Sequence, residues 1–155
     1  MTTRRLFSAF SFLLLLALMV PSRASADSQV RIVRLSLVDG PVQLDRSTGE
    51  GFERAIMNMP IAQGMQLWTR DDSRAEVEFE EGTSIRVTPG SRVEFSELIL
   101  RSDGTRSTVI RIDSGRVYVN FSPSHGEDFR ILVGNREILL DHSVHFRLDV
   151  LDERA

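Results

Sequence analysis

Hydrophobic and polar residues alternate along most of the chain between residues 30 and 150. In the run 75–80, for example, Ala75, Val77 and Phe79 share one face and three glutamates share the other. Successive side chains of a strand point to opposite faces, so this period of two predicts half-buried β-strands. Helical spacing is almost absent, and the one stretch that suits a helix, residues 53–57, is too short to form a stable one.

Turn residues divide the alternating pattern into short segments. Clusters of Gly, Pro, Asp and Ser recur about every ten residues, and one of them, residues 113–115, predicts a turn between two strands. We expect about ten to twelve short strands, at residues 30–38, 41–45, 52–55, 65–69, 75–80, 83–88, 93–100, 108–112, 116–121, 129–133, 137–140 and 144–150. This pattern predicts a single all-β domain, either a β-solenoid or β-roll or a sandwich.

The first 26 residues differ from the rest and have the three parts of a secretory signal. Arg4 and Arg5 precede an apolar run over residues 6–20, and Ala24-Ser25-Ala26 supplies the small residues of a cleavage site. We therefore expect cleavage after Ala26 and an exported domain over residues 27–155, without a stable membrane anchor. An uncleaved anchor is the alternative, but about 15 apolar residues are short for a spanning helix. The two arginines also fit a twin-arginine signal, so the export route stays open between that and the general secretory pathway.

Charge and cysteine content narrow the possible partners of this domain. Residues 27–155 contain 16 basic and 22 acidic residues, a net charge of −6, which disfavours nucleic acid as a partner. The chain has no cysteine, so disulfides, thiol chemistry and lipid attachment at a cysteine are excluded. All of its basic residues are arginine.

The titratable residues do not form a recognisable catalytic or metal-binding motif. His142 and His145 are three apart in a region expected to be extended, so their side chains point to opposite faces and cannot share one ion. The adjacent Asp141, His142 and Ser143 do not have the arrangement of a catalytic triad, whose members come from distant segments. The acidic pairs 71–72 and 127–128 lack the alternating oxygen ligands of a calcium loop. We expect no catalytic residue, no cofactor and no metal site.

Two apolar features are candidates for contact with a partner. Trp68 is the only tryptophan and lies beside Arg70, so it is a weak candidate for a partner contact; a position covering the rim of the core is favoured for it. Met57, Met59 and Met65, with Ile56 and Ile61, surround Pro60. We expect these five side chains to pack on the core, and the alternative is a partner surface.

Several blocks, taken in order, resemble the periplasmic domain of the FecR family, named for a ferric-citrate transport regulator. The blocks are Gly40-Pro41-Val42, then Pro60-Ile61, Gly64 and Leu67-Trp68-Thr69, then the strand–turn–strand segment 73–87, then Ser91 and Val93, and finally Ile112, Gly115 and Val117-Tyr118-Val119. The resemblance covers about residues 38–150. It implies a β-rich periplasmic domain that contacts other proteins. The family's usual Gly-Thr before the last strand is replaced here by residues 143–146.

The family's regulators sense a loaded outer-membrane receptor and control a sigma factor through a cytoplasmic segment. Only five residues precede the apolar run of this chain, so we expect it to lack that segment and to be a stand-alone exported domain. The leading hypothesis is a non-enzymatic sensor or scaffold domain, periplasmic or secreted, that binds an unidentified envelope protein through a sheet face or edge. The alternative is a carbohydrate- or peptidoglycan-binding β domain, and an enzyme ranks third.

Overall fold

The computed structural model describes residues 31–151, and these residues form eleven β-strands and one short 3₁₀ turn. The strands are β1 (Arg34–Asp39), β2 (Val42–Asp45), β3 (Phe52–Arg54), β4 (Gln66–Thr69), β5 (Arg74–Glu78), β6 (Ser84–Val87), β7 (Arg92–Leu100), β8 (Arg106–Phe121), β9 (Glu127–Val133), β10 (Arg136–Leu140) and β11 (Val144–Val150); the turn, η1, is Glu80–Gly82. The predicted all-β class and strand number are confirmed.

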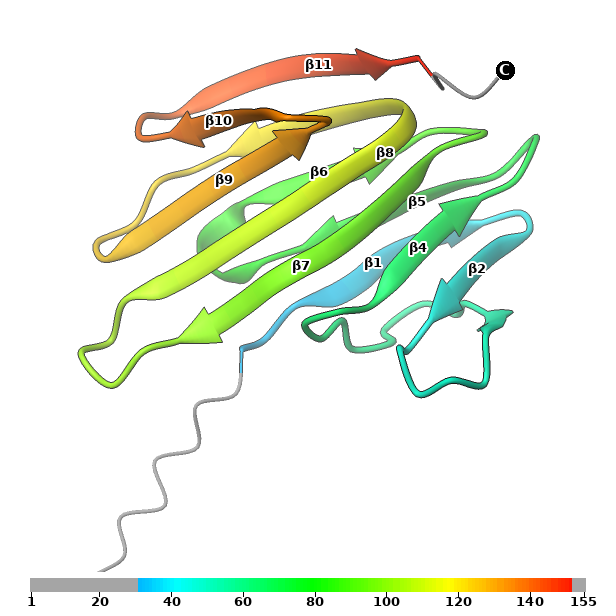
Figure 1. Ribbon diagram of the computed structural model, residues 1–155, viewed down its shortest axis with the longest axis horizontal. Helices are drawn as coiled ribbons and strands as arrows, with labels where there is room; N and C mark the ends of the chain where they lie inside the picture. The colour runs from blue at the N-terminus through cyan, green and yellow to red at the C-terminus, as the bar shows by residue number, and fades with distance from the viewer. Residues whose placement is uncertain (1–30, 152–155) are drawn as a thin grey trace, which may run out of the picture.

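The strands form two layers that face each other across the core (Figure 1). Sheet A has the order β1-β5-β6-β8-β11, and sheet B has the order β3-β2-β4-β7-β8-β9-β10. All neighbours are antiparallel except β8 and β9, which are parallel. A solenoid stacks successive coils in parallel, so the sandwich-like alternative describes this curled sheet better.

Strand β8 belongs to both layers because it bends at Gly115. Its residues 106–114 pair with β7 and β9 in sheet B, and its residues 115–121 pair with β6 and β11 in sheet A. Gly115 has φ +93°, a backbone conformation that favours glycine. The Ser91 hydroxyl is close to this bend and accepts a hydrogen bond of 2.9 Å from the Arg116 N–H. The predicted turn at residues 113–115 is therefore wrong: the chain bends there without reversing.

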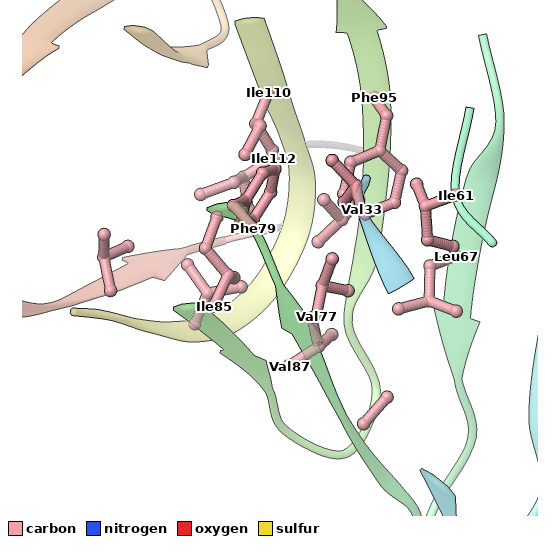
Figure 2. Packing of buried hydrophobic residues seen from close by; sticks show 14 of the residues in the cluster. Val33, Ile61, Leu67, Val77, Phe79, Ile85, Val87, Phe95, Ile110 and Ile112 are labelled. Carbon is pink, nitrogen blue, oxygen red and sulfur yellow. The ribbon is translucent and has the colours of Figure 1, made fainter. Parts of the chain in front are cut away.

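The inward faces of the two sheets make one core (Figure 2). The alternation seen in the sequence places Ala75, Val77 and Phe79 inside, each at most 3% exposed. Phe79 packs edge-on against Phe129 of the opposite layer, with ring centroids 5.4 Å apart. The apolar residues that alternate with polar ones in the sequence thus point inward from both sheets and form one core.

The edges of the sandwich are covered at one end and open at the other. At β1, the loop through Met59 caps the edge, because Leu35 N–H donates to Met59 C=O at 2.9 Å and Ile61 N–H donates to Val33 C=O at 2.8 Å. Among the described residues, β11 pairs only with β8, and β10 pairs only with β9. Strands β10 and β11 therefore leave two edges without a partner strand in the described part of the chain, at the end of the sandwich opposite β1 (Figure 1).

Candidate functional site

The outer face of sheet B presents a row of large polar and aromatic side chains. Arg54, Gln43, Trp68 and Arg92 are directly opposite one another across β3, β2, β4 and β7. Cross-strand partners share a face, so these four side chains lie together on the side away from the core. Leu67, the neighbour of Trp68, is fully buried on the other face.

Trp68 is the centre of a cluster with Phe52, Arg70 and Arg92, which we name the Trp68 cluster. The guanidinium carbons of Arg70 and Arg92 lie 4.2 and 4.9 Å from the Trp68 ring centroid. Phe52 meets the ring edge-to-face, with centroids 5.9 Å apart. Arg70 also donates a hydrogen bond of 3.2 Å to Gln43 Oε1. Stacking on the rings thus fixes two cations on the sheet surface.

The expected position of Trp68 at the rim of the core is wrong. Trp68 is partly buried, but it is buried by the cluster and not by the core residues. The predicted alternation, with Gln66 and Trp68 on one face and Leu67 on the other, is confirmed. The contact of Trp68 with a partner stays a prediction.

Four arginines of sheet B differ from most other arginines in their ion pairing, although Arg130 of the same sheet pairs with Asp128 and Glu137. On the outer face of sheet A, arginines pair with nearby carboxylates: Arg34 with Glu78, Arg86 with Glu76, and Arg116 with Asp149. On the outer face of sheet B, no ion pair with a carboxylate of residues 31–151 is formed by Arg54, Arg70, Arg92 or Arg111. Among residues 31–151, these four cations are therefore not ion-paired and are available to an external anion.

An open groove of about 930 Å³ adjoins the cluster, and Gln43, Arg54 and Arg70 line part of it. Ile56 and Met57 line another part and are 58% and 59% exposed. The expectation that the methionine-rich stretch packs on the core is thus wrong for Ile56 and Met57. It is confirmed for Ile61, which is buried, and for Met59 and Met65, which pack partly buried against the core.

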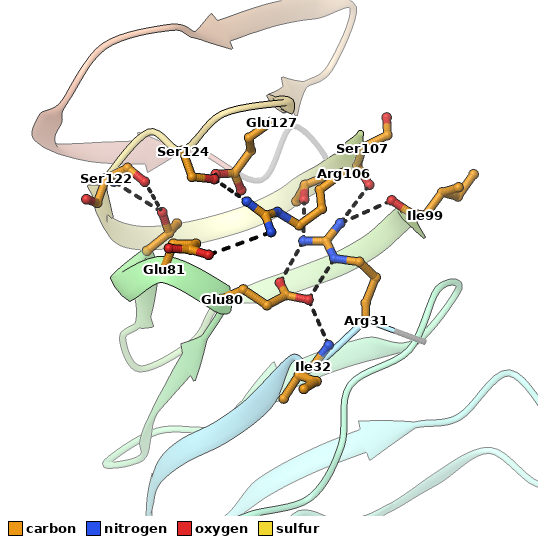
Figure 3. A network of polar contacts seen from close by, with 12 residues as sticks. Arg31, Ile32, Glu80, Glu81, Ile99, Arg106, Ser107, Ser122, Ser124 and Glu127 are labelled. Atoms are coloured by element: carbon orange, nitrogen blue, oxygen red, sulfur yellow. Dashed lines mark hydrogen bonds and ion pairs between the residues drawn. The ribbon is translucent and has the colours of Figure 1, made fainter. Parts of the chain in front are cut away.

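A second polar cluster lies at one end of the sandwich and is held together by Arg31 (Figure 3). Arg31 donates to both carboxylate oxygens of Glu80, at 2.8 and 2.9 Å, and to the backbone oxygen of Ser107 at 3.2 Å. The Ile32 N–H also donates to Glu80, at 2.7 Å. Burial raises the pKa of Glu80, but the hydrogen bonds from Arg31 and Ile32 outweigh it and hold the pKa below its ordinary value.

The same cluster extends through Arg106 to Ser124 and Glu127. Arg106 donates to the Ser124 hydroxyl, which donates to Glu127 at 3.0 Å. Burial raises the pKa of Glu127. The contacts of Arg31 and Ile32 fasten the segment before β1 to η1 and β8, and those of Arg106 hold the loop before β9. The sequence predicts a strand from residue 30, but among the described residues β1 begins only at Arg34. Arg31 lies before this strand, and its side chain is buried.

The residues considered for catalysis or metal binding are dispersed. His142 is exposed in a bend before β11, where its Nδ1 lies 2.5 Å from Asp141 Oδ1, and His145 is exposed on β11. The extended conformation expected for both histidines holds for His145 only. Glu127 and Asp128 begin β9 instead of lying in the expected loop. Within residues 31–151, no group of three metal-ligating side chains is present. Ala26 and the expected leader lie outside the described residues.

Comparison with known proteins gives one match. A family model described as "FecR protein" matches residues 65–153, more than half of the chain. The chain belongs to the FecR family. The suspected resemblance is thereby confirmed, and the FecR match includes β4 to β11 and the Trp68 cluster except Phe52. No curated protein and no solved structure matches significantly. No helix among the residues that the structure describes is long and apolar enough to cross a membrane.

Proposed function

We propose that this FecR-family chain is an exported, non-enzymatic protein-interaction domain of the cell envelope, with the Trp68 cluster as its contact face. The observation that supports this proposal is the group of arginines around Trp68 that lack carboxylate partners among residues 31–151. The FecR match over residues 65–153 supports a sensor or regulatory role in the envelope. The proposal includes the leader 1–26, its cleavage after Ala26, and a periplasmic or secreted domain over residues 27–155.

The chemistry of the cluster suits a protein partner with acidic side chains. Trp and Arg are the residues that most often dominate the binding energy of protein interfaces. The guanidinium group binds a carboxylate through two parallel hydrogen bonds, and Arg70 and Arg92 are already ordered by stacking on Trp68. The exposed Ile56 and Met57 in the adjoining groove offer apolar contact beside the charges.

A carbohydrate or peptidoglycan ligand is the second candidate, because Phe52 and Trp68 lie side by side on an open sheet face. A sugar would stack on the indole ring. Two guanidinium groups already lie over that ring within 5 Å of its centroid, so they compete with a sugar for the same surface. We therefore rank this candidate below a protein partner.

The proposal is tested by cross-linking the tagged full chain in its own cell and identifying the envelope proteins recovered with it. Trp68→Ala and Arg92→Ala are expected to weaken capture of the specific partner by about 30-fold each, the effect of losing about 2 kcal/mol at an interface centre. Arg86→Ala is the matched control, since Arg86 is an exposed arginine on the outer face of sheet A.

Two results would argue against the proposed function. One is recovery of no specific envelope protein in repeated experiments, and the other is equal capture by the two cluster variants and the control. Retention of the protein on insoluble cell wall, lost in Trp68→Ala, would instead favour the carbohydrate candidate.

A further inference from the structure

We propose that two copies of this chain associate through the free edge of β11, which pairs antiparallel with the β11 of a second copy to join the two A sheets. This interface is separate from the Trp68 cluster, which lies on sheet B. Figure 1 shows β11 as the outermost strand at the upper end of the sandwich. The proposal rests on the direction of the backbone groups of β11, on the partly exposed apolar side chains beneath it, and on its charge pattern.

The hydrogen bonds of β8 fix which backbone groups of β11 are free. Thr88 N–H donates to Arg116 C=O at 3.1 Å, so the backbone groups of Arg116 point toward β6. Ser122 also points that way, since its N–H donates to Thr83 Oγ1 at 3.1 Å. Backbone groups alternate in direction along a strand, so those of Val117, Val119 and Phe121 point toward β11.

The partners of these three residues on β11 are Leu148, Phe146 and Val144. Their backbone groups are therefore used in the ladder with β8. By the same alternation, the N–H and C=O groups of His145, Arg147 and Asp149 point to the open edge. Unpaired groups in such a row are a template for another strand.

The core is incompletely covered next to this edge. The inward side chains of β11, together with two from β9 and β10, are only partly buried: Val133, Ile138, Val144, Phe146, Leu148 and Val150. At the capped edge, Val33 before β1 and Leu35 of β1 are buried, at 2% and 0% exposure, while Val38 of β1 is partly buried. A strand added beside β11 would bury apolar surface at the end of the core where it is still available.

A second copy fits this edge because the outward charges of β11 complement themselves. Arg147 and Asp149 are two residues apart on one face, and within one copy Asp149 already pairs with Arg147 at 2.6 Å and with Arg116 at 2.5 Å, so a contact with a second copy extends an existing ion-pair network. When two identical strands pair antiparallel about Leu148, Arg147 lies opposite the partner's Asp149, and the symmetry repeats this contact. On the core side, the same register brings Leu148 opposite the partner's Leu148 and Phe146 opposite the partner's Val150. By symmetry this register makes five cross-strand contacts, two between opposite charges and three between apolar side chains.

The test is the molar mass of protein purified after expression of the full chain, measured by sedimentation equilibrium over a range of concentrations. We expect a reversible dimer. Arg147→Pro removes an N–H that faces the open edge and leaves the ladder with β8 intact, so it is expected to give a monomer with an unchanged circular dichroism spectrum. Arg147→Ala keeps that N–H and loses the two symmetric ion pairs, so it is expected to weaken the dimer by about fivefold.

A cross-linking experiment tests the register even if the proline variant does not fold. The chain has no cysteine, so single-cysteine variants report one contact each. An equal mixture of Arg147→Cys and Asp149→Cys is expected to oxidise mainly to the mixed 147–149 dimer, because these positions face each other in the proposed pairing. A wild-type protein that stays monomeric at every concentration, or a dimer that forms no mixed cross-link, would overturn the proposal.

Discussion

Arg31 shows how a single charged side chain can be buried in this fold. Its side chain is 3% exposed, and removing a guanidinium group from water is costly unless every donor finds an acceptor. Glu80 accepts two hydrogen bonds from it, and backbone oxygens of Ile99 and Ser107 accept further ones. The free-energy cost of burying the charges of Arg31 and Glu80 is therefore offset only while both side chains are present.

The variant Arg31→Ala is expected to lower the free energy of unfolding by about 2–3 kcal/mol, because Glu80 keeps its charge and loses its partner in a largely buried site. Arg34→Ala is the control. It breaks an exposed pair with Glu78 and should cost less than about 1 kcal/mol. Urea unfolding monitored by Trp68 fluorescence measures both values. Equal losses in the two variants would show that Arg31 does not stabilise the segment before β1.

The sequence alone could not identify these side chains as buried or clustered. Alternation identified which side of β4 Trp68 occupies, since Leu67 takes the apolar face. Alternation does not indicate which residues of other strands lie opposite, and the cluster depends on that register: Phe52 and Arg92 come from segments 16 and 24 residues away in the numbering. The burial of Arg31 is not evident from the run 30–38 for the same reason, since its partner Glu80 is distant in sequence.

At the scale of elements, the bend of β8 is what joins the two layers. A Cβ atom built on Gly115 would lie 2.3 Å from Ser91 Oγ and 2.5 Å from Ser91 Cα. Gly115 is thus needed both for its positive φ and for the close approach of the chain at Ser91. Thr69 lies on the other side of this contact, and its hydroxyl accepts a hydrogen bond of 3.0 Å from the Ser91 N–H.

We expect Gly115→Ala to destabilise the protein by about 2–3 kcal/mol, since it adds a clash with the backbone of Ser91 to the strain of a positive φ. Gly90→Ala is a matched control, with φ +70° and no atom within 4 Å of the added Cβ, and should cost only about 1 kcal/mol. Thermal unfolding followed by circular dichroism compares them. If the two variants melt together, the close approach at Ser91 is not important for stability.

The same glycine explains why one strand boundary was mispredicted. Asp113-Ser114-Gly115 has the composition of a tight turn, and most Gly-containing clusters of this chain do form turns, as at Pro89-Gly90 and Gly134-Asn135. Local composition does not distinguish a reversal from a bend in a continuous strand. Which of the two occurs depends on the partners available on each side, and here β9 and β11 prolong the sheets on both sides of the bend.

At the scale of the whole molecule, the two layers make a domain with two outer faces of different character. The outer face of sheet A pairs its arginines with its own carboxylates, while the outer face of sheet B leaves arginines free of described carboxylates around Trp68. The proposed functions use separate parts of this molecule: the face of sheet B for an envelope partner, and the β11 edge of sheet A for a second copy.

The proposed export of this domain predicts a defined processed form. Protein recovered from cells that express the full chain is expected to begin at Asp27, because Ala24 and Ala26 fit the small-residue pockets that a signal peptidase requires. Intact-mass spectrometry measures the processed species. Replacing both alanines by leucine should retain the leader, and recovery of the unprocessed wild-type chain from the cytosol would contradict the expectation.

The shared strand β8 also limits how the chain can change in length. Inside and outside alternate with every residue of a strand, and β8 is inserted between neighbours on both sides in both layers. Insertion of one residue beyond Gly115 would turn Val117, Val119 and Phe121 outward and expose three side chains now at most 1% exposed. Insertions and deletions are therefore expected only in the loops, such as residues 101–105 and 122–126, while the length of β8 stays constant.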